Sequence, residues 1–266
     1  MNKKLVFAFY LSKNYHSEIV DIHFRCLEWF KDSFDTVEIV FILDDDYNKE
    51  NLLDAQRRFT QIFLGKPISF SMVPNTPYRE ALVFHDYIAT KLSEHELVFF
   101  AHNKGTTNVD KFPLEEIYTW VMAMYFYSLN YMSEVEDMLW NKKFMSYGAF
   151  LTQNTEPEKP TKYDWYYVGT FFWINGKKIF QYMRNSNIPL PVMGDRFYAE
   201  EFLANIYPSW PYVTAGSHGT RYLTEADDFY HISTRHVRSC YTPEEDGFYD
   251  FFNKILDYGK TEQDSQ

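Results

Sequence analysis

The sequence has few cysteines and no apolar stretch long enough to cross a membrane. Its two cysteines, Cys26 and Cys240, cannot form a disulfide framework, and Cys26 falls in a helical pattern that favours a buried thiol. A membrane-spanning helix needs about 20 apolar residues. The apolar run near the start of the chain ends at Ser12, which is also too short for a secretory signal. We therefore expect a cytoplasmic protein with no membrane span.

Positive charge is also scarce. The chain carries 26 Lys and Arg against 37 Asp and Glu, a formal net charge of -11. Such a balance argues against a broad nucleic-acid footprint and against an anionic membrane surface. We expect no nucleic-acid partner, although a small basic pocket remains compatible with this charge.

Several common catalytic motifs are missing. The phosphate-binding spacing Gly-x4-Gly-Lys-Ser/Thr does not occur. Neither does Gly-x-Ser-x-Gly, the nucleophile elbow of many hydrolases. His218, His231 and His236 gather near the C-terminus, but their spacing matches no zinc signature.

What the chain does contain is a regular alternation of strand-like and helical patterns. Apolar runs of strand length occupy 5–11, 37–43, 68–73 and 97–101, and helical spacing occupies 15–30, 52–63 and 81–92. The strands recur at intervals of about thirty residues, which is the size of a βαβ unit. The pattern predicts an α/β fold with a mostly parallel, Rossmann-like sheet flanked by helices.

The second half of the chain is rich in aromatic residues and less regular. We expect two helices within 114–140, a strand over 144–151 and an aromatic strand over 165–174. In the aromatic strand, Gly169 and Thr170 would permit a bulge or a close backbone approach. Further helices are expected over 177–184, 196–205 and 247–256, followed by a polar tail, 260–266.

The end of the fourth apolar run is the first candidate site. His102, Asn103 and Lys104 follow the buried strand directly, and ligands of open α/β sheets bind at the carboxyl ends of the strands. These side chains offer neutral and cationic hydrogen-bond donors for anionic oxygens. The alternative is a strand that simply runs into a polar turn.

A second candidate follows the second strand, where Asp44, Asp45 and Asp46 stand in a row. Carboxylates at this edge could accept hydrogen bonds from a ribose or a base, or bind a divalent ion. The alternative is that they cap the next helix and favour its first turn.

A third candidate lies on a predicted helix, where Glu200 and Glu201 follow aromatic residues. Adjacent residues point in different directions on a helix, so at most one of them would face a cleft. A carboxylate in that place could act as a general base on a hydroxyl. A solvated helical acid is the alternative.

Taken together, these features resemble the GT-A-like glycosyltransferases of bacterial polysaccharide synthesis. The resemblance is greatest to the rhamnan-synthesis type, whose fourth strand ends in a His-x-Lys element, here His102-Asn103-Lys104. The stretch 165–173 (WYYVGTFFW) is similar to an aromatic strand of that family, and 196–201 (RFYAEE) is similar to its R-x-x-A-E helix. The resemblance covers about residues 5–207.

The resemblance implies a single GT-A-like domain over 1–259, with a nucleotide-binding half of about 1–112 and an acceptor half of about 113–259. Such an enzyme moves a sugar from a nucleotide-sugar donor to a hydroxyl of a glycan acceptor.

The same resemblance assigns roles to residues. Asp44, Asp45 and Asp46 would contact the nucleoside, and His102, Asn103 and Lys104 the pyrophosphate. The acceptor would meet the residues of the aromatic strand and the start of the later helix, namely Trp165, Gly169, Thr170, Trp173 and Arg196. Glu200 or Glu201 would take the acceptor proton.

One departure from the family bears on the metal. GT-A enzymes usually carry Asp-x-Asp at the end of the fourth strand, where it holds a divalent ion, and this chain has His102-Asn103-Lys104 there. The enzyme would then use cationic side chains and no cofactor, although Mn or Mg held elsewhere stays open. The alternatives are a non-catalytic module that binds a glycan or a partner, and a transferase acting on nucleic-acid bases, which the net charge disfavours.

Overall fold

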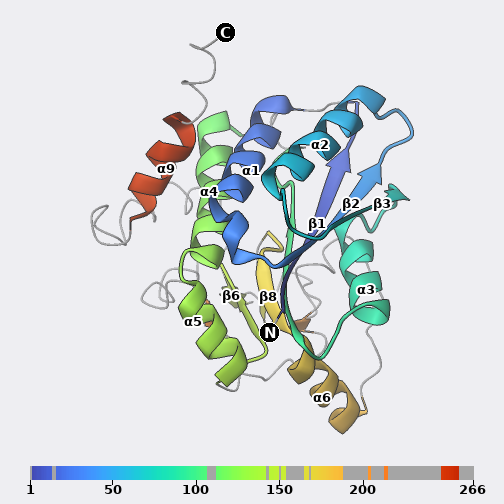
Figure 1. The fold of residues 1–266 in the computed structure, drawn as a ribbon, viewed down its shortest axis with the longest axis vertical. Coiled ribbons are helices and arrows are strands. Elements are labelled where there is room, and N and C mark those ends of the chain that lie inside the picture. The colour runs from blue at the N-terminus through green and yellow to red at the C-terminus, as the bar shows by residue number, and fades with distance from the viewer. Residues whose placement is uncertain are drawn as a thin grey trace.

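The computed structural model describes residues 2–13, 16–106, 112–141, 144–149, 151–153, 165–167, 169–187, 203–204, 213–214 and 247–257. Their centre is a seven-stranded sheet in the order β3-β2-β1-β4-β8-β5-β9, and a separate two-stranded sheet joins β6 and β7. Helices flank the large sheet (Figure 1), so the chain has the predicted α/β architecture.

The first half of the chain forms the predicted alternation of strands and helices. Its elements are β1 (Asn2–Leu11), α1 (Ser17–Phe30), η1 (Lys31–Ser33), β2 (Thr36–Leu43), α2 (Lys49–Ile62), β3 (Ile68–Pro74), α3 (Glu80–Thr90) and β4 (Glu96–His102). β1 pairs in parallel with both β2 and β4, and β2 pairs in parallel with β3. Every residue of β4 is buried, as its unbroken apolar run predicts for a central strand.

The second half extends the sheet with mixed strand directions. Its elements are α4 (Leu114–Leu129), α5 (Met132–Glu136), a π-helical turn η2 (Asp137–Asn141), β5 (Ser146–Gly148), β6 (Leu151–Gln153), β7 (Trp165–Tyr167), β8 (Phe172–Asn175), α6 (Gly176–Ser186), β9 (Val213–Thr214) and α9 (Phe248–Asp257). β8 runs antiparallel to both β4 and β5, whereas β9 runs parallel to β5.

Two strand predictions in this half are wrong in their extent. The run 144–151 divides into β5 and the start of β6, and the aromatic run 165–174 divides into β7 and β8. β5 and β8 belong to the large sheet, whereas β6 and β7 pair with each other. The aromatic run breaks because two successive residues, Gly169 and Thr170, take positive φ angles, 85° and 60°, which are outside the range of regular β-structure.

The large sheet separates two hydrophobic layers. Side chains alternate along β1, so Leu5, Phe7 and Phe9 pack with α1, α2 and α4, whereas Val6 and Ala8 pack with α3. The period of two in β1 therefore places one apolar set on each face, and this explains why its sequence has no polar side.

The last described helix, α9, returns to the first. Phe251 packs against Phe30 of α1 and Phe126 of α4, with ring centroids 5.3 and 5.4 Å apart. At the other end of α9, the Arg25 guanidinium donates to the carbonyl oxygens of Ile255 (3.1 Å) and Leu256 (3.3 Å). Figure 1 shows α9 beside α1 and α4. A cation thus satisfies helix-end carbonyls that have no partner within the helix.

Within the described part of the chain, no helix combines the length and the apolar character that a membrane span requires.

Candidate functional site

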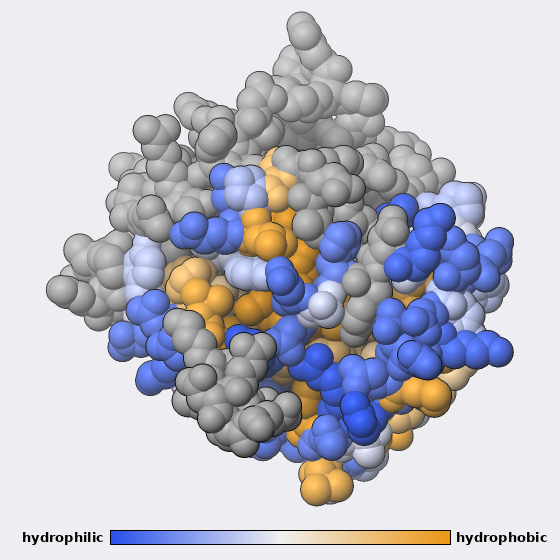
Figure 2. Space-filling model, turned by 90° about the horizontal axis from the view of Figure 1, so that it is seen from above, coloured by the Kyte–Doolittle hydropathy of each residue, from blue (hydrophilic) through white to orange (hydrophobic). Residues whose placement is uncertain are grey.

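The carboxyl ends of β1 and β4 lie side by side at the place where the strand order reverses. From β1 the chain proceeds to β2 and β3 on one side, and β4 then pairs on the other side of β1. In open α/β sheets such a reversal forms the crevice in which ligands bind. Seen from this end of the molecule, the described surface is largely hydrophilic, with hydrophobic residues visible between the polar ones (Figure 2).

Asn103 joins the two strands at this point. Its Oδ1 accepts from the backbone N–H of Tyr10 at 2.7 Å, and its Nδ2 donates to the Tyr10 carbonyl at 2.8 Å. The amide therefore continues the pairing of β1 beyond the end of β4. The structure thus gives Asn103 a positioning role through the backbone of Tyr10, and its predicted contact with pyrophosphate stays a prediction.

Asp44 is tied to the same place through the side chain of Tyr10. The Tyr10 hydroxyl donates to Asp44 Oδ2, and Asn75 Nδ2 donates to Asp44 Oδ1 at 2.6 Å. Burial, and then the hydrogen bond to Asp44, raise the pKa of Tyr10 to about 12, so its hydroxyl stays protonated as a donor. The capping alternative is excluded, because Asn48 caps α2 by accepting from Glu50 N–H at 2.8 Å.

Asp45 and Asp46 differ from Asp44 in being exposed. Asp46 forms an ion pair of 3.1 Å with Lys13, and both side chains are more than half exposed, at 52% and 69%. Surface pairs of this kind contribute little to stability. Of the three aspartates, Asp44 is the one whose carboxylate accepts hydrogen bonds from Tyr10 and Asn75 at this end of the sheet.

Lys104 is half-buried and extends over α4. Its Nζ lies 5.2 Å from the ring centroid of Trp120, which is a cation–π distance. The residue after it, Gly105, has a φ of 92°, and a Cβ there would meet Ile117 Cγ2 at 2.6 Å. This loop therefore requires glycine, and its shape directs Lys104 toward α4.

The predicted pyrophosphate contact His102 faces the protein. Its Nε2 lies 3.0 Å from the carbonyl oxygen of Gly169, and its Nδ1 lies 3.7 Å from Oε1 of Glu80. The residue is only 8% exposed. His102 thus links the start of α3 to the turn that follows β7, and its ring holds that turn in place.

The turn at Gly169 and Thr170 is strained. A Cβ on Gly169 would collide with the sulfur of Met124, so the predicted close backbone approach exists. Thr170 is β-branched and fully buried, yet its φ is 60°, which is a rare conformation for such a residue. Its Oγ1 has no hydrogen-bond partner among the described residues. Strain and unsatisfied groups of this kind concentrate at functional sites.

The acceptor prediction is corrected for Trp173. Its ring is 0% exposed and packs between Phe34 and Phe99, with centroids 5.7 and 5.1 Å away. Its Nε1 donates to the Ser128 carbonyl at 2.9 Å. Trp173 is therefore a core residue, because no face of its ring is available to a sugar.

Other predicted acceptor residues are only partly placed. The backbone of Trp165 lies in β7, at the edge of the small sheet. Arg196, Glu200 and Glu201 lie outside the described residues. The predicted roles of these residues stay predictions.

Sequence reasoning missed Tyr10, Asn75, Arg79 and Glu80. Tyr10 was counted only as part of an apolar run, although its position at the end of β1 could have marked it. Arg79 directly precedes α3, has a φ of 46°, and places its guanidinium 5.4 Å from the Tyr10 ring. A loop with two prolines and an asparagine before a helix was the available signal.

A resident divalent ion does not fit the described residues. They bring together no group of three His, Cys, Asp or Glu side chains that could hold a metal. Asp44 accepts from Tyr10 and Asn75, and Asp46 pairs with Lys13.

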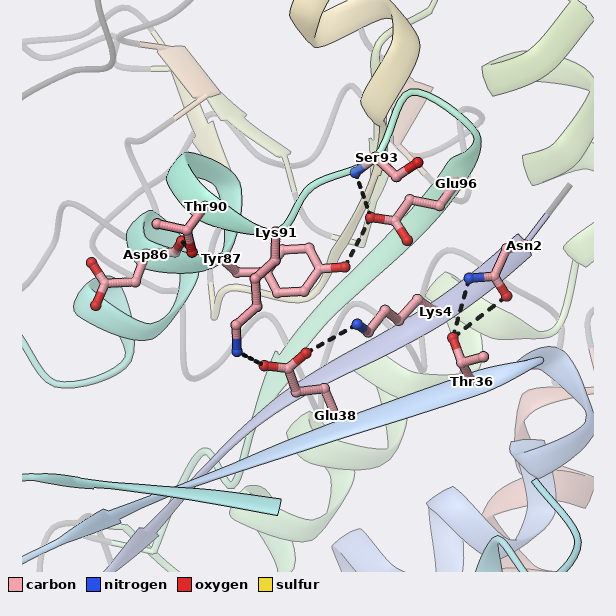
Figure 3. A network of polar contacts seen from close by, with 10 residues as sticks. All are labelled: Asn2, Lys4, Thr36, Glu38, Asp86, Tyr87, Thr90, Lys91, Ser93 and Glu96. Carbon is pink, nitrogen blue, oxygen red and sulfur yellow. Dashed lines mark hydrogen bonds and ion pairs between the residues drawn. The ribbon is translucent and has the colours of Figure 1, made fainter. Parts of the chain in front are cut away.

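A second polar cluster lies at the opposite, amino end of the sheet (Figure 3). Glu38 of β2 forms ion pairs with Lys4 at 3.0 Å and with Lys91 at 2.5 Å. Glu96 of β4 accepts from the Tyr87 hydroxyl and from Ser93 N–H, each at 2.8 Å. Burial alone would raise the pKa of Glu38, but the hydrogen bonds from Lys91 and Lys4 outweigh it and lower that pKa. This cluster pairs its charges internally and serves the structure.

No protein-family model matches the chain, and no curated protein sequence matches it.

Proposed function

We propose that the protein is a GT-A-like glycosyltransferase that moves a sugar from a nucleotide-sugar donor to a hydroxyl of a glycan acceptor. The observation that carries the proposal is the junction at the strand-order reversal, where Tyr10 contacts both Asp44 and Asn103. The parallel strands β3-β2-β1-β4, followed by the antiparallel β8, are compatible with a GT-A-like sheet.

The nucleoside would be held by Asp44. Tyr10 and Asn75 already donate to its carboxylate, which fixes the direction of the remaining lone pairs. A fixed carboxylate accepts hydrogen bonds from a ribose or a base without first losing rotational freedom. Asp45 and Asp46 are exposed at the same loop and would contact the outer part of the nucleoside.

The diphosphate would be met by cations. A leaving diphosphate gains negative charge as the sugar departs, and positioned positive charges stabilise it. Lys104 follows the end of β4 and Arg79 lies over Tyr10, so both belong to the carboxyl edge of the sheet. His102 would act indirectly by holding the Gly169 turn.

The acceptor side of the proposal rests on the sequence. Glu200 or Glu201 would take the proton from the acceptor hydroxyl, and Trp165 and Arg196 would contact the acceptor. Thr170 is as fully buried as Trp173, so it would act on the acceptor only through the shape of its turn. Trp173 no longer belongs to this group, since its ring is in the core.

The test is binding of nucleoside diphosphates, with Lys104→Ala as the variant. A panel of uridine, guanosine, cytidine and thymidine diphosphates, measured by thermal shift and calorimetry, should contain one ligand that stabilises the protein. Charged hydrogen bonds contribute about 1.5–3 kcal/mol. Lys104→Ala should therefore weaken the diphosphate about ten- to a hundredfold and leave the bare nucleoside nearly unchanged. Equal weakening of both ligands would contradict the role of Lys104.

Hydrolysis of the donor in the absence of acceptor separates this proposal from its alternative. A transferase should release free sugar slowly from the nucleotide sugar it binds. A non-catalytic module would bind a glycan or a partner but release no sugar.

Metal dependence is tested in the same assay. Full loss of activity in chelator, restored by manganese, would overturn the metal-free chemistry.

A further inference from the structure

The loop that carries Lys104 is fastened from α1 by a histidine that the proposed function does not use. His23 is only 1% exposed. Its Nε2 lies 2.9 Å from the carbonyl oxygen of Lys104, and its Nδ1 lies 3.0 Å from the hydroxyl of Tyr125 on α4. One ring therefore connects α1, α4 and the loop after β4.

The hydrogen-bond partners fix the proton on this ring. A carbonyl oxygen only accepts, so Nε2 carries the hydrogen, and the bare Nδ1 accepts from the Tyr125 hydroxyl. Burial lowers the pKa of His23 to about 3, and burial raises the pKa of Tyr125 well above its usual value. His23 is thus a neutral ring in a single tautomer throughout the physiological range.

Neighbouring contacts hold the loop on both sides of the Lys104 carbonyl, and the backbone N–H of Lys104 donates to the His102 carbonyl at 2.8 Å. Asn103 is paired with Tyr10, and the hydroxyl of Thr106 donates to the Asn103 carbonyl at 3.0 Å. Gly105 fits against Ile117 in a left-handed conformation. His23 adds the hydrogen bond that holds the Lys104 carbonyl, on the residue whose side chain carries the cation.

We propose that His23 is a positioning residue that sets the Lys104 cation for the diphosphate of the donor. The identity of that ligand rests on the proposed function, whereas the fastening of the loop by His23 does not. The inference therefore needs two measurements, one without any ligand and one with it.

The first measurement uses a matched pair of substitutions. In His23→Gln the amide nitrogen reaches about the place of Nε2 and can still donate to the Lys104 carbonyl. In His23→Asn the shorter amide reaches only the place of Nδ1, so it keeps the partner Tyr125 and loses the loop. Both variants are neutral and polar, and Cys26→Ala, a change at a buried residue one turn along α1, serves as the control for general destabilisation.

Hydrogen exchange of a peptide covering 103–106 is then compared at equal distance below each melting temperature. We expect exchange in His23→Asn to be at least about tenfold faster than in His23→Gln and in Cys26→Ala. Equal exchange in the two histidine variants would overturn the inference.

The second measurement is calorimetric titration with the nucleoside diphosphate that stabilises the wild type most, and with its bare nucleoside. His23→Asn should weaken the diphosphate about tenfold and leave the nucleoside unchanged, whereas His23→Gln should bind both like the wild type. The double variant His23→Asn with Lys104→Ala should bind no more weakly than Lys104→Ala alone, because the two residues act through one cation. Additive losses would contradict the positioning role.

The two proposals fail differently. If the wild type binds no nucleoside diphosphate, the proposed function is wrong, and the exchange measurement still decides whether His23 holds the loop. If the wild type binds and both histidine variants bind equally well, the function stands and the positioning role is wrong.

Discussion

The two ends of the parallel sheet carry polar clusters of opposite character. At the amino end, Glu38 and Glu96 are buried, and each accepts from two partners. At the carboxyl end, Asp44 and Asn103 are tied to Tyr10, but the surrounding backbone is strained and two buried side-chain oxygens lack partners among the described residues, those of Asn75 and Thr170. In the amino-end cluster both carboxylates have hydrogen-bond or ion-pair partners. The carboxyl-end cluster is held in a backbone conformation that it does not by itself favour.

The distribution of backbone strain agrees with this contrast. Among the described non-glycine residues, positive φ angles occur at Arg79, Thr170 and Asn187. Asn187 caps the end of α6, where a left-handed residue is common. The other two border the carboxyl-end cluster through Tyr10 and His102. Strain of this kind persists only where the surroundings impose it, and its place at the carboxyl end agrees with the proposed site.

The largest effect on stability should come from a core residue of β8, away from both polar clusters. Trp173→Ala removes a fully buried ring of β8 and should cost about 3–5 kcal/mol of unfolding free energy, as measured by urea titration. The donor affinity of the remaining folded protein should be unchanged. A variant that stays stable but binds glycan more weakly would contradict the core assignment of Trp173 and support its stacking role.

The pH dependence of stability should distinguish the two ends of the sheet, because their titrating groups act in different pH ranges. The unfolded chain protonates His23 below about pH 6.5, whereas the folded pKa is about 3, so the unfolded state binds more protons between these values and stability falls as pH falls. Between pH 6.5 and 5 this amounts to about 1.6 kcal/mol, since the slope rises from half of 1.36 kcal/mol per pH unit at pH 6.5 toward the full value below it. His23→Gln should flatten the slope in this window.

The pKa of Glu38 is lowered, so its contribution is present above the ordinary carboxyl pKa and is lost only at lower pH. Glu38→Gln should therefore change the stability curve below about pH 4.5 and leave the window above pH 5 unaltered. A slope above pH 5 that depended on Glu38 would contradict the assignment of that window to His23.

Glu38→Gln at neutral pH should affect stability alone. The substitution leaves Lys4 and Lys91 without a countercharge and should cost about 1–2 kcal/mol, with donor affinity unchanged. Asp32→Asn is the matched control, because Asp32 is 91% exposed and should tolerate the change within about 0.5 kcal/mol. A loss of donor affinity in Glu38→Gln would show that the two ends are coupled.

Tyr10→Phe is the converse experiment at the carboxyl end. It removes the donor that fixes Asp44 and should weaken nucleoside binding about tenfold, which corresponds to 1.4 kcal/mol. Its effect on unfolding should be smaller than that on binding, since the ring stays in place. A variant that is destabilised but binds normally would show that the bond from Tyr10 to Asp44 serves stability, as the bonds of the amino end do.

The smallest expected effect has the opposite sign. Thr170→Gly relieves a left-handed conformation that costs about 1–2 kcal/mol in a residue with a Cβ, against the entropic cost of glycine of about 0.5–1 kcal/mol. A gain of about 0.5 kcal/mol together with reduced transferase activity would fit a trade of stability for function. A clear loss of stability would mean that Thr170 is an ordinary packing residue.

The parallel half of the fold was predictable because each element there follows a simple period. Leu5 to Leu11 and Leu97 to Ala101 lie in strands between helices whose apolar spacing is plain, and the structure confirms them. The run from Trp165 to Ile174 misled because aromatic β-formers suggest one strand regardless of the turn inside it. The structure shows that the strand breaks at the left-handed pair Gly169 and Thr170, where the backbone of Gly169 packs closely against Met124.

The position of the candidate residues on the sheet was predictable, but their contacts were not. The rule that ligands meet the carboxyl ends of strands located Asp44 and the loop after β4. The sequence could not show that Asn103 pairs with the Tyr10 backbone, or that His102 faces Gly169. Such contacts join residues far apart in the chain, and a local pattern contains no information about them.

The docking of α9 also determines the order in which the chain can fold. The hydrogen bond from Arg25 to Ile255 spans 230 positions of sequence. During synthesis the N-terminal strands emerge long before α9. Until then Phe30 and Phe126 lack their contacts with Phe251. Contacts of such long range slow folding, because their loop-closure entropy is lost before they form. A ribosome-bound chain that stops short of α9 should therefore expose an aromatic face to which chaperones can bind.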